Sequence, residues 1–167
     1  VSALTSGDGV VYVGGVFGSA GGLRVNDVAK WDGARWSALG SGFGDVLNDR
    51  VNALALDGSG NLYVGGTFST VGGIAVSNVA RWDGTSWSSL GPGVNGTVYA
   101  LAFAGGTLYV GGSFTEAGGI IANRIAAWTG TTWASLGSGM DWTVLSLAID
   151  SGVLYAGGDF TTAGGAA

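Results

Sequence analysis

The sequence contains no cysteine and no histidine. Without cysteine there is neither a disulfide framework nor a thiolate metal site, so composition does not indicate a redox compartment. The two absences together remove the usual zinc and copper ligands and the side chain that most often acts as a catalytic base. We therefore expect a protein that is not an enzyme, with no catalytic residues, no metal site and no cofactor.

Charge is also scarce. Charged residues make up 10% of the sequence, and six basic against eleven acidic residues give a net charge of -5. The sequence has no basic cluster, which argues against nucleic acid as a partner. No apolar run reaches the roughly 18 residues that a membrane-spanning helix needs, so we expect no membrane insertion.

Glycine is abundant, with 35 residues, and it falls at repeated positions between strand-like runs. The clearest repeated motif, Leu62–Gly66, carries a tyrosine that recurs at Tyr12, Tyr63, Tyr109 and Tyr155, which are 51, 46 and 46 residues apart. A fixed period of roughly 20 to 50 residues indicates stacked supersecondary units that bury their apolar faces against one another.

The repeat predicts three complete units and a half unit. Their boundaries are 1–50, 51–97, 98–143 and 144–167. Because Val1 opens inside a unit, we expect the sequence to be a segment of a longer protein.

Each complete unit contains four short runs with strand character. In the second unit they lie at 51–56, 62–66, 78–82 and 87–90. Asp83-Gly84 separates the last two runs and favours a tight reversal of the chain. No segment has a sustained helical period, so the sequence predicts an all-β protein.

Four-stranded units of about 46 residues are typical of β-propeller blades, because radial repetition hides most strand edges. An open β-solenoid is the less favoured alternative. Three and a half blades do not complete a ring, so we expect this segment to belong to a larger ring or array. The half-blade after Val144 also offers an edge for self-association, which leaves assembly from more than one chain open.

The repeat pattern is similar to known families. Its clearest examples are 109–114, 123–128, 133–139 and 93–98. The order of the motifs loosely resembles the kelch repeat, and more closely the repeat of fungal cortical cell-polarity markers and of bacterial secreted or surface proteins. This resemblance implies a β-propeller that is extracellular or on the cell surface, serves positioning or binding, and has no catalytic residues.

Aromatic residues recur in every unit. A tryptophan pair flanks the same turn three times, as Trp31 and Trp36, Trp82 and Trp87, and Trp128 and Trp133. A sugar-binding platform is one interpretation, but large aromatics repeated in each unit are what fills the space between twisted sheets. We therefore interpret these pairs, with the repeated tyrosines and phenylalanines, as packing residues.

Three local motifs match known functional patterns only in part. Asp83–Trp87 is close to an Asp-box but lacks its spacing, so we interpret it as a turn. Asp57, Ser59 and Asn61 have the spacing that opens a calcium loop, but no acidic residue closes the loop. Asn95-Gly96-Thr97 matches a glycosylation acceptor and is equally an ordinary turn.

Functional residues are expected where the repeat is broken, because shared positions are explained by packing. The first unit carries about four extra residues within 43–50, and the third has Trp142 where the second has Gly96. In a four-stranded blade these connections share one face with the loops between the second and third strands. The predicted ligand or partner face contains Phe43, Asp45, Asp49, Arg50 and Trp142.

The favoured function is a non-catalytic scaffold, extracellular or on the cell surface, that binds a protein or a glycan through this face. The alternative is a structural subunit of an extracellular assembly or fibre. A glycosidase that uses two of Asp45, Asp49 and Asp141 is the least favoured hypothesis, since it needs two carboxyl groups about 5–10 Å apart across a cleft.

Overall fold

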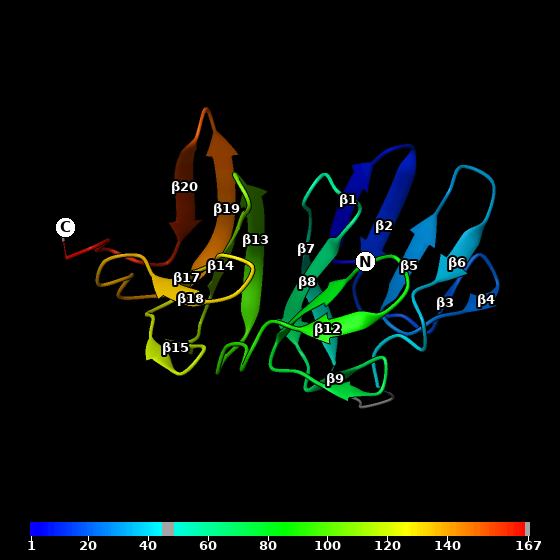
Figure 1. Ribbon diagram of the computed structural model, residues 1–167, viewed down its shortest axis with the longest axis horizontal. Coiled ribbons are helices and arrows are strands. Elements are labelled where there is room, and N and C mark those ends of the chain that lie inside the picture. Colours follow the sequence, from blue (N-terminus) through cyan, green and yellow to red (C-terminus); the bar gives the residue numbers. More distant parts are fainter. Residues whose placement is uncertain (45–48, 166–167) are drawn as a thin grey trace.

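The computed structural model describes residues 1–44 and 49–165. These residues form strands and turns, with no helix among them, and therefore no helix that could cross a membrane. The all-β prediction is confirmed. Figure 1 shows several antiparallel sheets that follow one another across the molecule.

Three four-stranded sheets and one two-stranded sheet make up the body of the structure. The first sheet contains β1 (Ala3–Gly7), β2 (Val10–Gly14), β5 (Val28–Trp31) and β6 (Trp36–Ala38). The second contains β7 (Arg50–Leu56), β8 (Leu62–Thr67), β11 (Val79–Trp82) and β12 (Trp87–Ser89). The third contains β13 (Val98–Ala104), β14 (Thr107–Gly112), β17 (Ile125–Trp128) and β18 (Trp133–Ser135), and the last pairs β19 (Val144–Asp150) with β20 (Val153–Gly158).

A two-residue turn closes a small hairpin after the second strand of each complete sheet. These hairpins are β3–β4 (Ser19–Ala20, Leu23–Arg24), β9–β10 (Thr70–Val71, Ile74–Ala75) and β15–β16 (Glu116–Ala117, Ile120–Ile121). In the second of them Gly72 and Gly73 have φ angles of 59° and 81°. Positive φ at both central residues defines a type I′ turn, which accounts for the repeated glycine pair.

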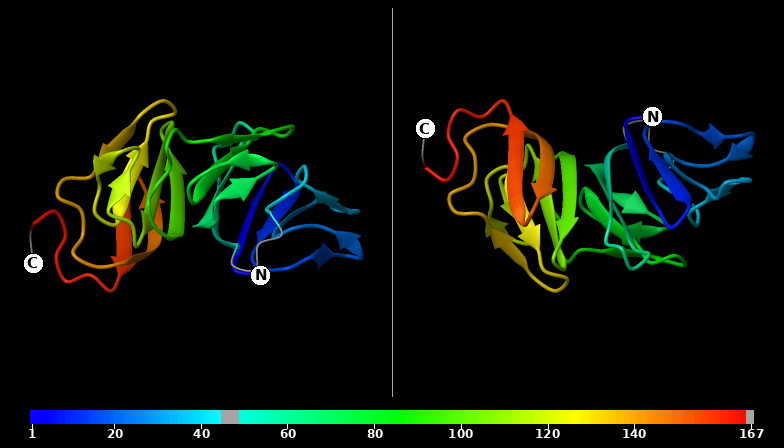
Figure 2. Two further views of the ribbon diagram at one scale, coloured as in Figure 1. Left: turned by 90° about the horizontal axis from the view of Figure 1, so that it is seen from below. Right: turned by 90° about the horizontal axis from the view of Figure 1, so that it is seen from above.

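Each complete sheet runs in chain order, so that every strand pairs with its predecessor in the unit. The first strands of consecutive sheets lie next to one another: β1 contacts β7, β7 contacts β13, and β13 contacts β19. The first and last sheets lie at opposite ends of the molecule (Figures 1 and 2). The arrangement is a propeller-like succession of sheets.

In the first two sheets an aspartate holds the turn between the third and fourth strands. In the second sheet Asp83 accepts hydrogen bonds from the backbone N–H groups of Thr85 and Ser86, both at 2.8 Å. These bonds hold the pKa of Asp83 well below its usual range. Gly84 has a φ of 99°. The interpretation of Asp83–Trp87 as a turn is confirmed.

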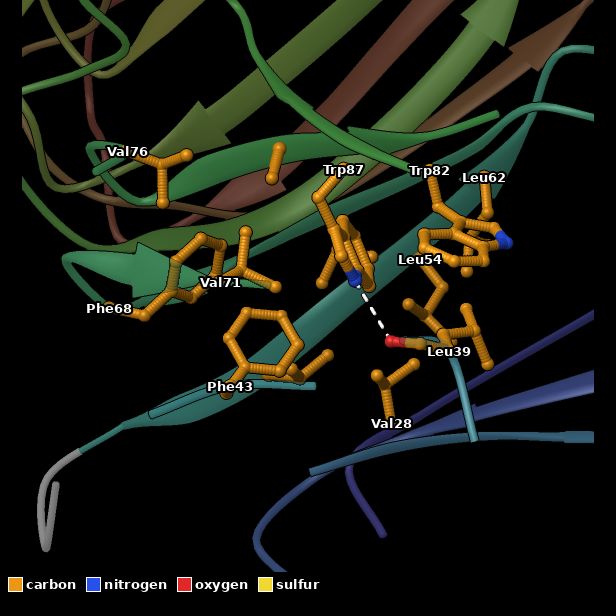
Figure 3. Packing of buried hydrophobic residues seen from close by; sticks show 13 residues of the cluster. Val28, Leu39, Phe43, Leu54, Leu62, Phe68, Val71, Val76, Trp82 and Trp87 are labelled. Carbon is orange, nitrogen blue, oxygen red and sulfur yellow. Dashed lines mark hydrogen bonds between the residues drawn. The ribbon is translucent and has the colours of Figure 1, made fainter. Parts of the chain in front are cut away.

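The hydrophobic core lies between consecutive sheets. One cluster joins the first sheet to the second, with Val28 and Leu39 on one side and Leu62, Val64 and Trp82 on the other (Figure 3). A second cluster joins the second sheet to the third. It consists of residues at repeat-equivalent positions, among them Val79, Leu90, Leu108, Val110 and Phe114.

Each contact between complete sheets carries the same indole hydrogen bond. Trp87 Nε1 donates to the carbonyl oxygen of Leu39 at 2.9 Å, and Trp133 Nε1 donates to that of Leu90 at 2.8 Å (Figure 3 shows the first). Trp87 also packs against Trp82, with ring centroids 5.2 Å apart, and each is only 8% exposed. The packing interpretation of this tryptophan pair is confirmed.

Two glycines of the second strand allow close approach, Gly65 by the next sheet and Gly66 by β7 of its own sheet. A Cβ at Gly65 would clash with the Val98 side chain of β13, and one at Gly66 would clash with the carbonyl oxygen of Arg50. Their φ angles are not positive, so close approach, rather than an unusual backbone conformation, requires glycine here.

Replacing Trp87 by phenylalanine tests the contact between sheets. We expect Trp87→Phe to lower the free energy of unfolding by about 1–3 kcal/mol. It removes one of the two hydrogen bonds to the buried Leu39 carbonyl, whose other donor is the Gly42 N–H, and it opens a gap. Trp36→Phe is the matched control, since the Trp36 indole makes no hydrogen bond within the described residues, and it should cost less than about 1 kcal/mol. Denaturant unfolding followed by circular dichroism measures both, and equal losses would contradict the role of the bond.

Candidate binding surface

The loops at one end of the sheets form a continuous face. Asn95 accepts hydrogen bonds from the backbone N–H groups of Thr115 and Glu116 at 2.8 and 3.0 Å. Asp141, at the equivalent position of the next unit, accepts from Thr161 and its neighbour at 2.9 and 3.0 Å. In the third and the last sheet, the connection that enters the sheet therefore lies against the segment that follows its second strand. We call the surface formed by these connections and loops, which include Asn95, Thr115, Asp141 and Thr161, the loop face.

Phe43 does not lie on the exposed part of the loop face. Its ring is 1% exposed and packs against Phe68 and Trp87, with centroids 4.7 and 5.7 Å away (Figure 3). Phe43 forms an isolated antiparallel β-bridge with Val71 of β9. Val94 and Met140 form the same kind of bridge in the later units. Phe43 thus occupies a repeated core position, and the repeat is broken only after it. This corrects the sequence interpretation, which included Phe43 in the partner face.

The other predicted face residues differ in exposure. Asp45 lies outside the described residues. Asp49 is 8% exposed, whereas Arg50 is exposed and Trp142 is 62% exposed. Asp49, Gly96 and Trp142 occupy equivalent positions, each two residues before a buried valine of a first strand.

A polar pocket of about 250 Å³ joins Asp49 and Arg50 to residues of three sheets. Its lining residues are Val16, Asp49, Arg50, Asn52, Thr67, Thr97 and Tyr99. We call it the charged pocket. Asn52 and Tyr99 are not among the predicted face residues, although both differ between units.

Asn52 and Tyr99 reach this pocket because each sits at an irregularity in its strand. The pairing of β7 with β8 shifts between Val51 and Ala53, and that of β13 with β14 shifts between Val98 and Ala100. A β-bulge redirects the side chain of the extra residue. Tyr99 is 38% exposed as a result, and the Asn52 amide donates to the carbonyl oxygen of Val98 at 3.0 Å.

A second pocket of about 480 Å³ adjoins the first. It has an apolar floor of Phe68, Val76 and Val94, and hydroxyl and amide groups around it. The remaining lining residues are Asp49, Thr67, Ser69, Ser77, Asn78 and Asn95. We call it the hydroxyl pocket. Asp49 and Thr67 line both pockets, so the two meet at these residues.

The Asp49 carboxylate is electrostatically unusual. Its Oδ2 atom is buried and has no hydrogen-bond partner among the described residues. Burial raises the pKa of Asp49, and the negative charge of Asp27 raises it further. Arg50 forms no ion pair with it, because the single ion pair in the described part of the chain joins Asp32 to Arg35.

The Asp141 carboxylate has the opposite character. The Thr161 hydroxyl and the backbone N–H of Thr162 donate to it, and these bonds lower the pKa of Asp141 to about 2. The carboxylate thereby fastens one loop to another. Within residues 1–44 and 49–165, no three carboxylates gather where they could hold a metal ion.

Asn95, the residue of the glycosylation motif, holds the equivalent loop without a charge. Its side-chain amide nitrogen donates to the Thr115 hydroxyl at 3.0 Å, in addition to the two bonds that its oxygen accepts. The residue itself is exposed. A glycan attached to this nitrogen would have to preserve or replace that bond, and glycosylation at Asn95 stays a prediction.

No protein-family model matches the chain, and no curated protein matches it. The structure is similar to the crystal structure of the computationally designed Ika4 protein, with a TM-score of 0.59 and 18% sequence identity. The match covers 93% of this chain and 83% of that chain. At this identity the similarity concerns the fold alone.

Replacing Asp49 by asparagine tests the cost of the buried carboxylate that lacks a donor. We expect Asp49→Asn to raise the free energy of unfolding at pH 7 by about 1 kcal/mol, because the buried charge without a partner is removed. The folded-state pKa of Asp49 is raised, so the folded protein takes up its proton first as the pH falls, and the advantage of the variant should shrink toward about pH 4.

Denaturant unfolding at several pH values measures this difference. Asp150→Asn removes the same charge from an exposed position in β19 and serves as the control. A destabilised Asp49→Asn variant, or an advantage that grows as the pH falls, would contradict the assignment.

Proposed function

We propose that the sheets are blades of a β-propeller built from a kelch-like repeat, and that this chain forms part of a larger ring or array. The chain-order sheets, the adjacent first strands and the repeated indole bond between sheets support this proposal. The resemblance to repeats of secreted and surface proteins supports an extracellular or cell-surface location.

We infer that the protein is a non-catalytic binding scaffold whose loop face holds a protein or a glycan. The observation that carries this proposal is the separation of two kinds of residue. Within the complete sheets, Trp87 and Phe114 at repeated positions are buried between sheets, whereas Arg50, Tyr99 and Trp142, which break the repeat, are exposed.

The chemistry of the exposed set fits molecular recognition. Tyrosine, tryptophan and arginine are the residues that most often dominate binding energy at interfaces. Tyr99 and Trp142 belong to neighbouring first-strand regions, at the start of β13 and just before β19. A partner lying across the loop face would contact both without disturbing the core.

Binding to immobilised glycans and to surface extracts tests the scaffold. Arg50→Ala and Trp142→Ala should each weaken binding by about 10-fold or more, as expected for interface anchors. Arg35→Ala is the matched control for Arg50, because its side chain is 81% exposed at a turn between a third and a fourth strand, away from the loop face. Binding that survives both loop-face substitutions would contradict the proposal that the loop face is the binding surface.

A structural role in an extracellular assembly is a second candidate, favoured by the exposed outer side of the first sheet. Val1 and Leu4 are 77% and 65% exposed, whereas their repeat equivalents Val51 and Leu54 are buried against a preceding sheet. Tyr155 of β20 is likewise 55% exposed. These surfaces suit contact with further sheets, and a strictly monomeric protein in light scattering would count against the assembly.

A further inference from the structure

Asp49 combines three properties that point to a ligand. It is 8% exposed, its Oδ2 atom lacks a hydrogen-bond partner, and it lines both the charged pocket and the hydroxyl pocket. A buried polar atom without a partner calls for an explanation, because nearly all such atoms in native proteins are satisfied. Arg81 Nε, the other such atom found in the described residues, belongs to neither of these pockets.

The missing partner must be a hydrogen-bond donor. A carboxylate oxygen only accepts hydrogen bonds, and burial without a donor is costly. Arg50 follows Asp49 directly but does not pair with it, and the charge that acts most on Asp49 is that of Asp27, which is also negative. The two pockets that meet at Asp49 are where an outside donor would enter.

The charged pocket offers both signs of charge to a ligand. A cation would meet Arg50, and an anion would meet Asp49, so a neutral molecule with several donors and acceptors fits both groups. The hydroxyl oxygens of Thr67 and Thr97, 3.0 Å apart, add groups that both donate and accept. The part-exposed ring of Tyr99 adds an apolar surface.

We propose that the charged pocket binds a neutral sugar residue. One sugar hydroxyl donates to the Asp49 carboxylate, another accepts from the Arg50 guanidinium, and the C–H face of the ring lies on Tyr99. The inference rests on the proposed scaffold function and narrows its ligand from protein or glycan to neutral carbohydrate.

The hydroxyl pocket extends the site. It opens from Asp49 and Thr67 and presents Ser69, Ser77 and Asn95 around an apolar floor. Alternating polar and apolar lining of this kind suits a second sugar ring in the same way as the first. The ligand is therefore an oligosaccharide that spans both pockets, not a single monosaccharide.

The experiment is an array of neutral and charged oligosaccharides, followed by calorimetric titration of a neutral compound that binds. Asp49→Asn should weaken its affinity about 10- to 100-fold, the value of a hydrogen bond to a charged group, while the folded state remains at least as stable. Tyr99→Ala should weaken it about 10-fold, whereas Tyr99→Phe, which keeps the ring, should not. Asp150→Asn should leave the affinity unchanged.

The outcomes separate this inference from the scaffold proposal. Loss of binding in Asp49→Asn and Tyr99→Ala, with both controls intact, supports the sugar site. Binding that is lost in Trp142→Ala but kept in Asp49→Asn overturns the sugar site and leaves the loop face standing. The sugar site is also overturned if the protein binds only charged glycans of the array, or only a protein partner. If none of these substitutions changes binding, both proposals are overturned.

Discussion

The structure depends on the way in which one sheet is fastened to the next. At each contact between complete sheets, a tryptophan of the later sheet donates its indole N–H to a leucine carbonyl of the earlier one, as Trp87 does to Leu39 and Trp133 to Leu90. The indole fills the space between the sheets, and the same side chain gives a buried backbone carbonyl a second hydrogen bond beside the one from a glycine N–H. Glycine in the second strand, as at Gly65, lets the sheets approach closely enough for this bond.

The loop face follows from that fastening. Because the sheets are held at one spacing, the connections that enter the third and the last sheet lie against the segment after the second strand of that sheet, where Asn95 and Asp141 make matching hydrogen bonds. Side chains that break the repeat therefore stand on a rigid base. A stacked core of this kind tolerates a local cost such as the unpaired Asp49 oxygen, and places that break local rules are where function is expected.

Much of this architecture is predictable from the sequence, because it is repeated. The period, the glycine pairs and the Asp83-Gly84 turn each have a local physical cause that spacing reveals. The site is less predictable. At Phe43 an insertion adjoins a core position, so the sequence does not separate the two. The β-bulges recur in the first strands, but spacing in the sequence does not show where they direct Asn52 and Tyr99, and the burial of Asp49 depends on contacts between units.

Hydrogen exchange of the indole N–H groups, resolved by NMR, tests the fastening of the sheets most directly. Trp87 and Trp133 should exchange at least about 100-fold more slowly than Trp36, because their bonds break only when neighbouring sheets separate. Trp36 has an equivalent position in the first sheet and no carbonyl partner in the described chain. Equal exchange rates for the three indoles would contradict the account.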